Sequence, residues 1–125
     1  MHRVFVYGSL KKGFGNHDLI SNQNLEGADS VKGAFKMISL GGFPGVLGGE
    51  RFDKSRISVE SYLVDDNSLQ DLDRLESEGD FYHRRVFVSE KDREGFMYIL
   101  DDRYDDDYDL APFYKDEKGD LVYEW

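Results

Sequence analysis

The sequence predicts a single α+β domain in which short strands outnumber helices. Its 125 residues are enough for one hydrophobic core, but not for two without help from metals or disulfides. Segments with strand character occur along the whole chain. The few helical segments do not alternate regularly with them, which argues against a doubly wound nucleotide-binding fold. We therefore treat residues 1–125 as one domain without an internal boundary.

The N-terminal half is predicted to contain three strands and a short helix. A run of β-branched and aromatic residues over 3–7 indicates a buried strand, which ends at Gly8. Residues 16–25 can form a short helix capped by the asparagine at their start. Residues 31–40 are expected to be extended until a Gly-Gly-Phe-Pro-Gly stretch breaks them. Residues 57–64 alternate with a period of two, which is typical of a strand with both faces partly covered.

A longer helix is predicted over residues 67–76. Asn67 with Gln70 three residues later is a weaker form of the capping box, and three leucines spaced three residues apart form an apolar stripe. At about 100° per residue, Glu76 falls about 20° from Leu69, inside that stripe. A carboxylate there either reaches water from a frayed helix end or faces a cavity. In a cavity, burial would raise its pKa to a value suited to proton transfer.

Two hairpins are predicted in the C-terminal part. The strands 82–89 and 96–100 are joined by a polar turn that ends in glycine. The segments 113–114 and 121–123 flank a second turn, in which Gly119 can adopt the required backbone conformation.

Composition and charge exclude several function classes. The net charge of −10 disfavours DNA, RNA and anionic membranes as partners, because these ligands are bound mainly through Lys and Arg. The absence of cysteine excludes a Cys nucleophile and thiolate metal ligands. No apolar run approaches the ~18–20 residues that span a bilayer, and the first residues run directly into a strand pattern instead of a signal peptide. We therefore expect a cytoplasmic protein.

Six aspartates lie close together between residues 101 and 109. Such a stretch is either a calcium-binding loop or a solvated acidic loop. It lacks the Asp-x-Asp-x-Asp-Gly spacing and the distal Glu of the familiar calcium loop, so we expect a solvated loop.

The loop after the first strand, Tyr7-Gly8-Ser9-Leu10, is the second candidate for a functional segment. Its main-chain N–H groups can point at an anion such as a substrate carboxylate, although an ordinary strand-to-loop turn has the same spacing. It is not a nucleotide-binding loop, because the Gly-Lys-Ser/Thr ending and the third glycine of the dinucleotide motif are both missing.

Other candidates are weaker. The three histidines are widely separated and show no metal-binding spacing, so no metal site is expected. Ser9 lacks the Gly-x-Ser-x-Gly elbow of a serine nucleophile. Arg84 and Arg85 project to opposite sides of a strand, so one of them either binds a substrate carboxylate or forms a surface ion pair.

Four motifs, in this order, resemble the gamma-glutamyl cyclotransferase-like family, especially its gamma-glutamylamine cyclotransferases and AIG2-like members. They are the opening residues 4–13 with Asn16-His17, the Pro-Gly segment 42–46, the Leu-Asp-x-x-Glu helix end 72–76 and the next strand 82–88. The resemblance covers roughly residues 3–100.

The resemblance implies a small mixed β-barrel flanked by one or two main helices, acting on a small-molecule γ-glutamyl substrate without a cofactor. It implies that the loop Tyr7-Gly8-Ser9-Leu10 holds the γ-glutamyl head and that Glu76 is the catalytic acid/base. The hydroxyl of Tyr82 is expected to line the same pocket. In the implied reaction, the substrate's α-amine attacks its γ-carbonyl and releases 5-oxoproline and an amine.

Two departures from the family pattern leave alternatives open. Ser77 stands where a glycine usually follows the helix-end Glu, and Glu60-Ser61 stands where the family usually has Gly-Glu. They motivate the alternative of a non-catalytic domain that keeps the fold but binds a ligand or a partner. Hydrolysis of a related amide is a third possibility. We expect a monomer, and the amine part of the substrate is not determined by these motifs.

Overall fold

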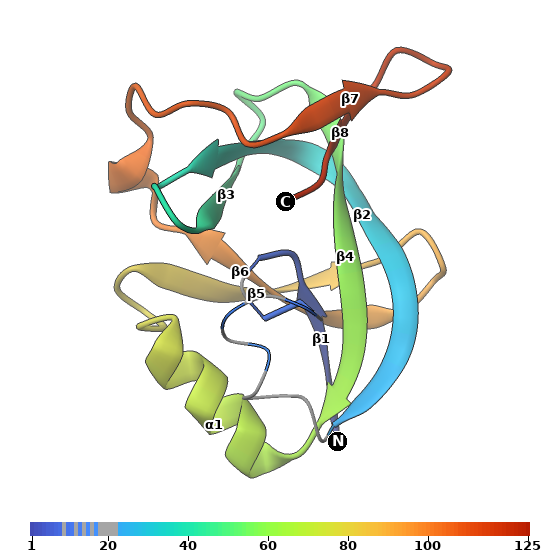
Figure 1. The fold of residues 1–125 in the computed structure, drawn as a ribbon, viewed down its shortest axis with the longest axis vertical. Coiled ribbons are helices and arrows are strands. Elements are labelled where there is room, and N and C mark those ends of the chain that lie inside the picture. The colour runs from blue at the N-terminus through green and yellow to red at the C-terminus, as the bar shows by residue number, and fades with distance from the viewer. Residues whose placement is uncertain (9, 12, 14, 16, 18–22) are drawn as a thin grey trace.

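The computed structural model describes residues 1–8, 10, 11, 13, 15, 17 and 23–125. In this part of the chain, one curled sheet makes up most of the fold and a single α-helix, α1 (Asp66–Leu75), packs beside it (Figure 1). The strands are β1 (His2–Val6), β2 (Asn24–Ser39), β3 (Pro44–Gly48), β4 (Lys54–Val64), β5 (Tyr82–Val88), β6 (Glu94–Leu100), β7 (Phe113–Lys115) and β8 (Leu121–Tyr123). The strand-dominated α+β fold that the sequence predicts is confirmed.

The sheet is mixed, with the order β3-β2-β4-β1-β6-β5 and with β8 and β7 branching from β4. β1 is antiparallel to β4 but parallel to β6, and β8 runs parallel to β4. The long strands β2 and β4 bend around the core, as Figure 1 shows. The hydrogen-bonded path ends at β3 and β5, which do not pair with each other among the described residues. The barrel is therefore a curled half-barrel.

Both faces of β1 are buried, which explains why the strand is apolar at successive positions. Val4 and Val6 pack in the core cluster that contains Leu72 of α1. Phe5 and the following Tyr7 pack in a second cluster, formed by residues of β2, β3, β4 and β6. Because successive strand residues point to opposite faces, β1 can belong to both clusters at once.

The N-cap of α1 lies two residues before the predicted capping residue Asn67. The side chain of Asp65 is the N-cap and accepts a hydrogen bond from the N–H of Ser68 at 2.7 Å. Asp65 satisfies a free N–H group of the first turn, and its negative charge also interacts favourably with the helix N-terminus. The helix ends at Leu75, which is 41% exposed. The predicted apolar stripe is therefore shorter than expected.

One strand and one helix differ from the sequence-based expectations. The start of β3 was expected to interrupt the preceding strand and form a turn, because its first residues are proline and glycine. Proline is tolerated at the start of an edge strand, and β3 pairs only with β2 in the described chain. The predicted helix over 16–25 falls largely outside the described residues, but its last two positions, Asn24 and Leu25, belong to β2. The β5–β6 and β7–β8 hairpins are confirmed, and Gly119 has a φ of 84°.

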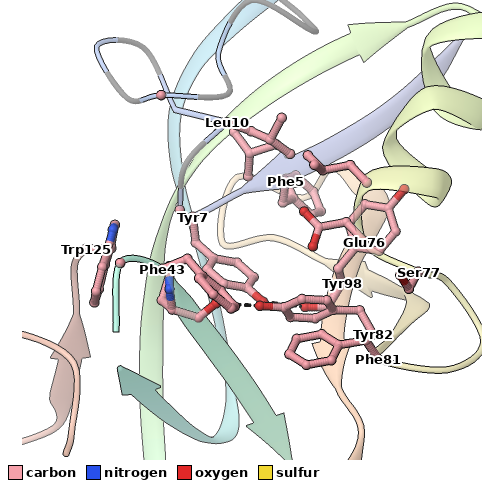
Figure 2. A pocket seen from close by; sticks show the side chains of 16 residues that line it. Phe5, Tyr7, Leu10, Phe43, Glu76, Ser77, Phe81, Tyr82, Tyr98 and Trp125 are labelled. Carbon is pink, nitrogen blue, oxygen red and sulfur yellow. Dashed lines mark hydrogen bonds between the residues drawn. The ribbon is translucent and has the colours of Figure 1, made fainter. Parts of the chain in front are cut away.

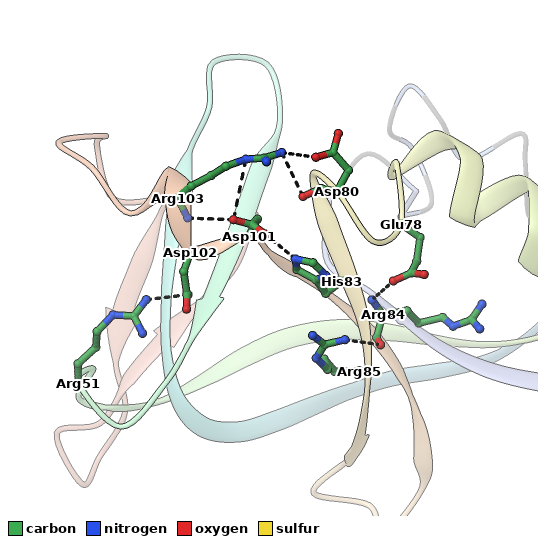
Figure 3. Close-up of polar contacts among 9 residues, drawn as sticks. All are labelled: Arg51, Glu78, Asp80, His83, Arg84, Arg85, Asp101, Asp102 and Arg103. Carbon is green, nitrogen blue, oxygen red and sulfur yellow. Dashed lines mark hydrogen bonds and ion pairs between the residues drawn. The ribbon is translucent and has the colours of Figure 1, made fainter.

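The acidic stretch forms ion pairs with several segments as well as contacting solvent. Asp101 contacts Nε2 of His83 at 2.6 Å, and Arg51 contacts Asp102 at 2.8 Å (Figure 3). Arg51 also contacts Asp105 at 3.2 Å. These contacts attach the segment after β6 to β5 and to the turn between β3 and β4. Among the described residues, no helix has the length and apolar character needed to cross a bilayer.

Candidate functional site

A cavity of about 490 Å³ lies where six segments of the chain meet (Figure 2). Its walls come from the end of β1 with the loop that follows, the 42–44 segment at the start of β3, the end of α1, the start of β5, Tyr98 of β6, and Trp125. These segments are far apart in the sequence. The curl of the sheet brings them together.

The described residues that the family resemblance assigned to catalysis and substrate binding lie together in this cavity. Tyr7, Gly8 and Leu10 form one part of its lining, and Glu76 and Tyr82 form another. Ser9, the remaining predicted substrate-binding residue, lies outside the described residues.

Glu76 occupies the C-cap position of α1, and its N–H donates to the main-chain oxygen of Leu72 at 2.9 Å. The side chain is mostly buried and points into the cavity (Figure 2). Among the described residues, its carboxylate is not part of any hydrogen bond or ion pair that would stabilise the charged form. Burial therefore raises the pKa of Glu76 to about 7, because desolvation disfavours an ionised carboxylate.

The turn after α1 sets the direction of this side chain. The N–H of Glu78 donates to the main-chain oxygen of Asp73 at 2.9 Å, and that of Ser77 donates to Arg74 at 3.2 Å. Together they form the Schellman arrangement that closes many helices. Ser77 has a φ of 47°, a left-handed conformation that glycine usually supplies. The serine at this position thus keeps a backbone turn for which glycine would be the common choice.

Two tyrosines join the cavity walls through their hydroxyls. Tyr7 donates to the main-chain oxygen of Tyr98 at 2.6 Å, and Tyr82 donates to that of Pro44 at 2.6 Å. Burial, and then the nearby charge of Glu76, raise the pKa of Tyr82, and burial with the charges of Tyr82 and Glu76 raises that of Tyr7. Both phenols therefore stay neutral, and the hydroxyl proton of each is already donated to a main-chain carbonyl in the cavity wall.

Gly8 is required for a reason that the sequence analysis did not identify. A β-carbon at this position would lie 2.8 Å from Cγ of Pro44, which is too close for any other residue without movement. Gly8 has no positive φ, whereas Gly13 in the same loop has a φ of 89°. The loop after β1 therefore turns at Gly13, and Gly8 allows the close approach of β3.

Asp73, which the sequence analysis placed in a motif without a role of its own, connects α1 to the sheet. Its carboxylate accepts a hydrogen bond from the hydroxyl of Tyr98 at 2.7 Å and pairs with Arg84 at 2.6 Å. Arg84, a candidate substrate-binding cation, is thus paired with α1, and Arg85 is exposed. The position of Asp73 one turn before Glu76 could have indicated that it lies near the site. Its partners could not be predicted in the same way, because they belong to β5 and β6.

Five aromatic residues in the lining were also missed: Phe5, Phe43, Phe81, Tyr98 and Trp125. They belong to different strands and loops, and no local motif groups them. The three that are not in a strand interior lie beside turns or at the end of the chain.

Comparison with known proteins identifies the family. Residues 4–120 match the model of the family described as "Gamma-glutamyl cyclotransferase, AIG2-like". A putative gamma-glutamylcyclotransferase of Vibrio cholerae is 37% identical over 60% of the chain and 62% of its own length. Another, from Methanocaldococcus jannaschii, is 36% identical over 79% of the chain and 84% of its own length. Gamma-glutamylaminecyclotransferase C of Danio rerio is 36% identical over 66% of the chain and 59% of its own length.

The fold is shared as well. The crystal structure of a mouse AIG2-like protein superimposes with a TM-score of 0.67 and 24% identity, covering 86% of this chain and 82% of the mouse chain. The family match extends over nearly the whole sequence and includes every described segment of the cavity except Trp125. The chain therefore belongs to the AIG2-like gamma-glutamyl cyclotransferase family.

Proposed function

We propose that the protein is a gamma-glutamylamine cyclotransferase, which converts a γ-glutamyl amine into 5-oxoproline and a free amine. The observation that carries this proposal is a single carboxylate, Glu76, with a pKa of about 7, facing a cavity whose wall includes the loop after β1. Family membership supports γ-glutamyl cyclotransferase chemistry. The name of the zebrafish relative supports an amine as the leaving group.

The proposed reaction asks little of the protein, because the nucleophile belongs to the substrate. The α-amine attacks the γ-carbonyl, a lactam C–N bond forms, and the original amide C–N bond breaks. Holding the chain folded supplies the proximity, which in well-oriented intramolecular reactions corresponds to effective concentrations on the order of 10⁵–10⁸ M. Glu76 takes a proton from the α-ammonium group and returns one to the departing nitrogen. A pKa of about 7 suits both transfers near neutral pH.

The glutamyl head would be held by main-chain groups of the loop after β1. The N–H of Lys11 is already used by the main-chain oxygen of Gly8 at 2.9 Å. This hydrogen bond closes a turn at the start of the loop, and the proposal assigns the α-carboxylate or the developing oxyanion to other N–H groups of the same loop. Neutral tyrosine rings complete the wall and exclude water from the reacting atoms.

The test is formation of 5-oxoproline from γ-glutamyl amines, γ-glutamyl dipeptides and glutathione. We expect the parent protein to release 5-oxoproline and Glu76→Gln to be slower by about 10²–10⁴-fold, the usual contribution of general acid/base catalysis. The matched control is Glu78→Gln, the same substitution on an exposed side chain two residues away, with activity near that of the parent. Circular dichroism checks that both variants are folded.

The pH profile tests the same assignment independently. Because the base must be ionised to accept a proton, kcat/KM should increase as the pH rises through about 7. The residual activity of Glu76→Gln should lack this limb. A parent protein that releases no 5-oxoproline from any of these substrates would contradict the proposal.

The two departures from the family pattern are compatible with catalysis. Ser77 keeps the turn that directs Glu76. The hydroxyl of Ser61 donates to Glu26 at 2.8 Å, and neither Glu60 nor Ser61 is in the described lining of the cavity. If Glu76→Gln binds γ-glutamyl compounds as the parent does and the parent shows no turnover, the alternative of a binding domain is favoured.

A further inference from the structure

The rim of the cavity contains a group of hydrophobic side chains that the proposed chemistry does not use. From it we infer that the leaving group is an uncharged, apolar or aromatic amine, and that Trp125 is a specificity-determining residue for it. This inference rests on the proposed function and deepens it, because it names the class of amine that is released.

The rim consists of Phe43, Leu75, Phe81 and Trp125. Phe43 and Leu75 are each 41% exposed, and Phe81 and Trp125 are half-buried. Trp125 and Phe43 lie on the opposite side of the cavity from Glu76 in Figure 2. Exposed hydrophobic side chains that converge on one opening indicate contact with an apolar ligand, since scattered ones would not share a cavity.

Phe81 is held in place by aromatic and ionic contacts. The centroid of its ring lies 4.9 Å from that of the Tyr82 ring and 4.6 Å from that of the Tyr104 ring. Its main-chain oxygen accepts from the N–H of Asp101 at 2.9 Å. In the same loop region, Arg103 pairs with Asp80 at 2.5 Å (Figure 3). The acidic stretch thus supports this side of the rim.

Trp125 is also fixed by contacts on both sides. Its main-chain oxygen accepts a hydrogen bond from Nζ of Lys11 at 2.9 Å. The preceding residue, Glu124, donates its N–H to Pro112 at 3.1 Å, and β8 immediately before it pairs with β4. The side chain of Trp125 also packs against the second core cluster, so the indole is largely ordered before binding and ordering it costs little.

The position of the reacting bond determines which part of the substrate reaches this rim. The γ-amide must lie close to Glu76 for proton transfer, within about 2.6–3.2 Å or through one water. In the proposed binding mode, the charged glutamyl head lies against the described start of the loop after β1, on the side of Tyr7 and Gly8. The substituent on the amide nitrogen extends toward the opening, where it meets Phe43, Phe81 and Trp125.

The charges around the rim disfavour an amino acid as the leaving group. Among the described lining residues, Glu76 is the sole Asp, Glu, Lys or Arg. Of the neighbouring cations that the structure describes, Arg84 pairs with Asp73, and Nζ of Lys11 is directed to the main-chain oxygen of Trp125. A second carboxylate on the leaving group would lie against the aromatic rings of the rim, where none of the described lining residues supplies a cation. Burying an unpaired charge there is costly. An uncharged amine avoids this penalty.

Four substrates separate the effect of the ring from that of the carboxylate. γ-Glutamylmethylamide and γ-glutamylphenethylamide are uncharged on the leaving side, and γ-glutamylglycine and γ-glutamylphenylalanine are the same compounds with a carboxylate added. We expect kcat/KM for 5-oxoproline release to be at least about tenfold higher for phenethylamide than for methylamide, the lower end of what a few methylene-sized contacts supply. Adding the carboxylate should lower kcat/KM at least about tenfold, both from the methylamide to γ-glutamylglycine and from the phenethylamide to γ-glutamylphenylalanine.

The variant Trp125→Ala should lower kcat/KM for phenethylamide at least about tenfold more than for methylamide, mainly through KM. Tyr114→Ala is the matched control, because Tyr114 is another aromatic residue of the C-terminal segment, is 54% exposed and does not line the cavity. An equal loss on both amides would overturn the assignment of Trp125, and dipeptides that react as well as the amides would overturn the inferred class of amine.

A binding measurement distinguishes failure of this inference from failure of the proposed function. Trp125 is the single tryptophan of the chain, so its fluorescence reports directly on the rim. In Glu76→Gln, γ-glutamylphenethylamide should change this fluorescence and bind at least about tenfold more tightly than γ-glutamylmethylamide. If binding shows this preference but the parent makes no 5-oxoproline, the cyclotransferase proposal fails and the apolar subsite stands. Equal binding of the two amides overturns the subsite.

Discussion

Gly8 lies against the ring of Pro44, and a β-carbon there would come within 2.8 Å of Cγ and 2.9 Å of Cδ. A proline ring has little freedom to move, so an added methyl group must push the loop after β1 away from β3. Both segments line the cavity, and Pro44 also accepts the hydrogen bond from Tyr82. The shape of the site at this point thus depends on the absence of one side chain.

Gly8→Ala should therefore destabilise the protein by about 1–3 kcal/mol, the usual cost of overpacking, and reduce 5-oxoproline formation. Urea unfolding and the activity assay measure the two effects. Gly15→Ala is the control: Gly15 also lines the cavity, but a β-carbon there meets nothing within 4 Å. Equal stability of the two variants would show that the contact with Pro44 is not limiting.

At the scale of secondary-structure elements, the end of α1 decides where Glu76 points. The helix is closed by main-chain hydrogen bonds, and its last turn is joined to β5 and β6 through Asp73. The one strained position in this arrangement is Ser77, with its φ of 47°. A residue with a β-carbon pays for this conformation by about 1–2 kcal/mol, which glycine avoids.

Ser77→Gly should consequently stabilise the protein by up to about 1 kcal/mol, because relief of the strain exceeds the extra entropy of the unfolded chain. Ser77→Ala keeps the β-carbon and should stay near the parent in stability. Urea midpoints of the three proteins provide the comparison. The turn is unchanged in both variants, so the proposed activity should persist. A glycine variant no more stable than the alanine variant would contradict the account of strain.

At the scale of the whole molecule, two kinds of carboxyl group act on stability in opposite pH ranges. Contacts with Arg3, Ser30 and His83, respectively, hold the pKa values of Glu26, Glu90 and Asp101 below their usual range. Their contribution is present above the usual carboxyl pKa near 4 and is lost as the pH falls. They make the folded state sensitive to acid.

Glu76 has the reverse effect, because burial raises its pKa from 4.5 to about 7. The folded state binds this proton more tightly than the unfolded state, so the stability it contributes is present below pH 4.5 and is lost as the pH rises through about 7. Together the two kinds of carboxyl predict maximal stability near pH 5.

Glu76→Gln should accordingly gain stability relative to the parent between pH 5 and pH 8, by up to about 3 kcal/mol at about 1.36 kcal/mol per pKa unit. Urea unfolding of parent, Glu76→Gln and Glu78→Gln at both pH values measures this difference, and Glu78→Gln should follow the parent. If the parent and Glu76→Gln depend on pH in parallel, the carboxyl of Glu76 does not have a raised pKa.

Much of the fold could be predicted from local patterns. β1, β4, the β5–β6 hairpin and α1 were expected near their observed positions, because period-two and helical spacings record which faces are buried. β3 was missed because Pro44 and Gly45 read as a turn, and the edge position that allows them is a property of the assembled sheet. The prediction of Asn67 as the N-cap was wrong, because Asp65, two residues earlier, also has a suitable side chain and only the backbone path selects one of them.

The sequence by itself determined two candidate parts of a functional site, a carboxylate at the end of an apolar helix and a glycine-containing loop after β1. It could do so because both features are local. The tertiary structure decided the rest. It buries Glu76 through the turn at Ser77, leaves Leu75 partly exposed, and brings Phe43, Phe81 and Trp125 to one opening. Burial and convergence depend on contacts between residues far apart in the chain, which spacing along the sequence does not encode.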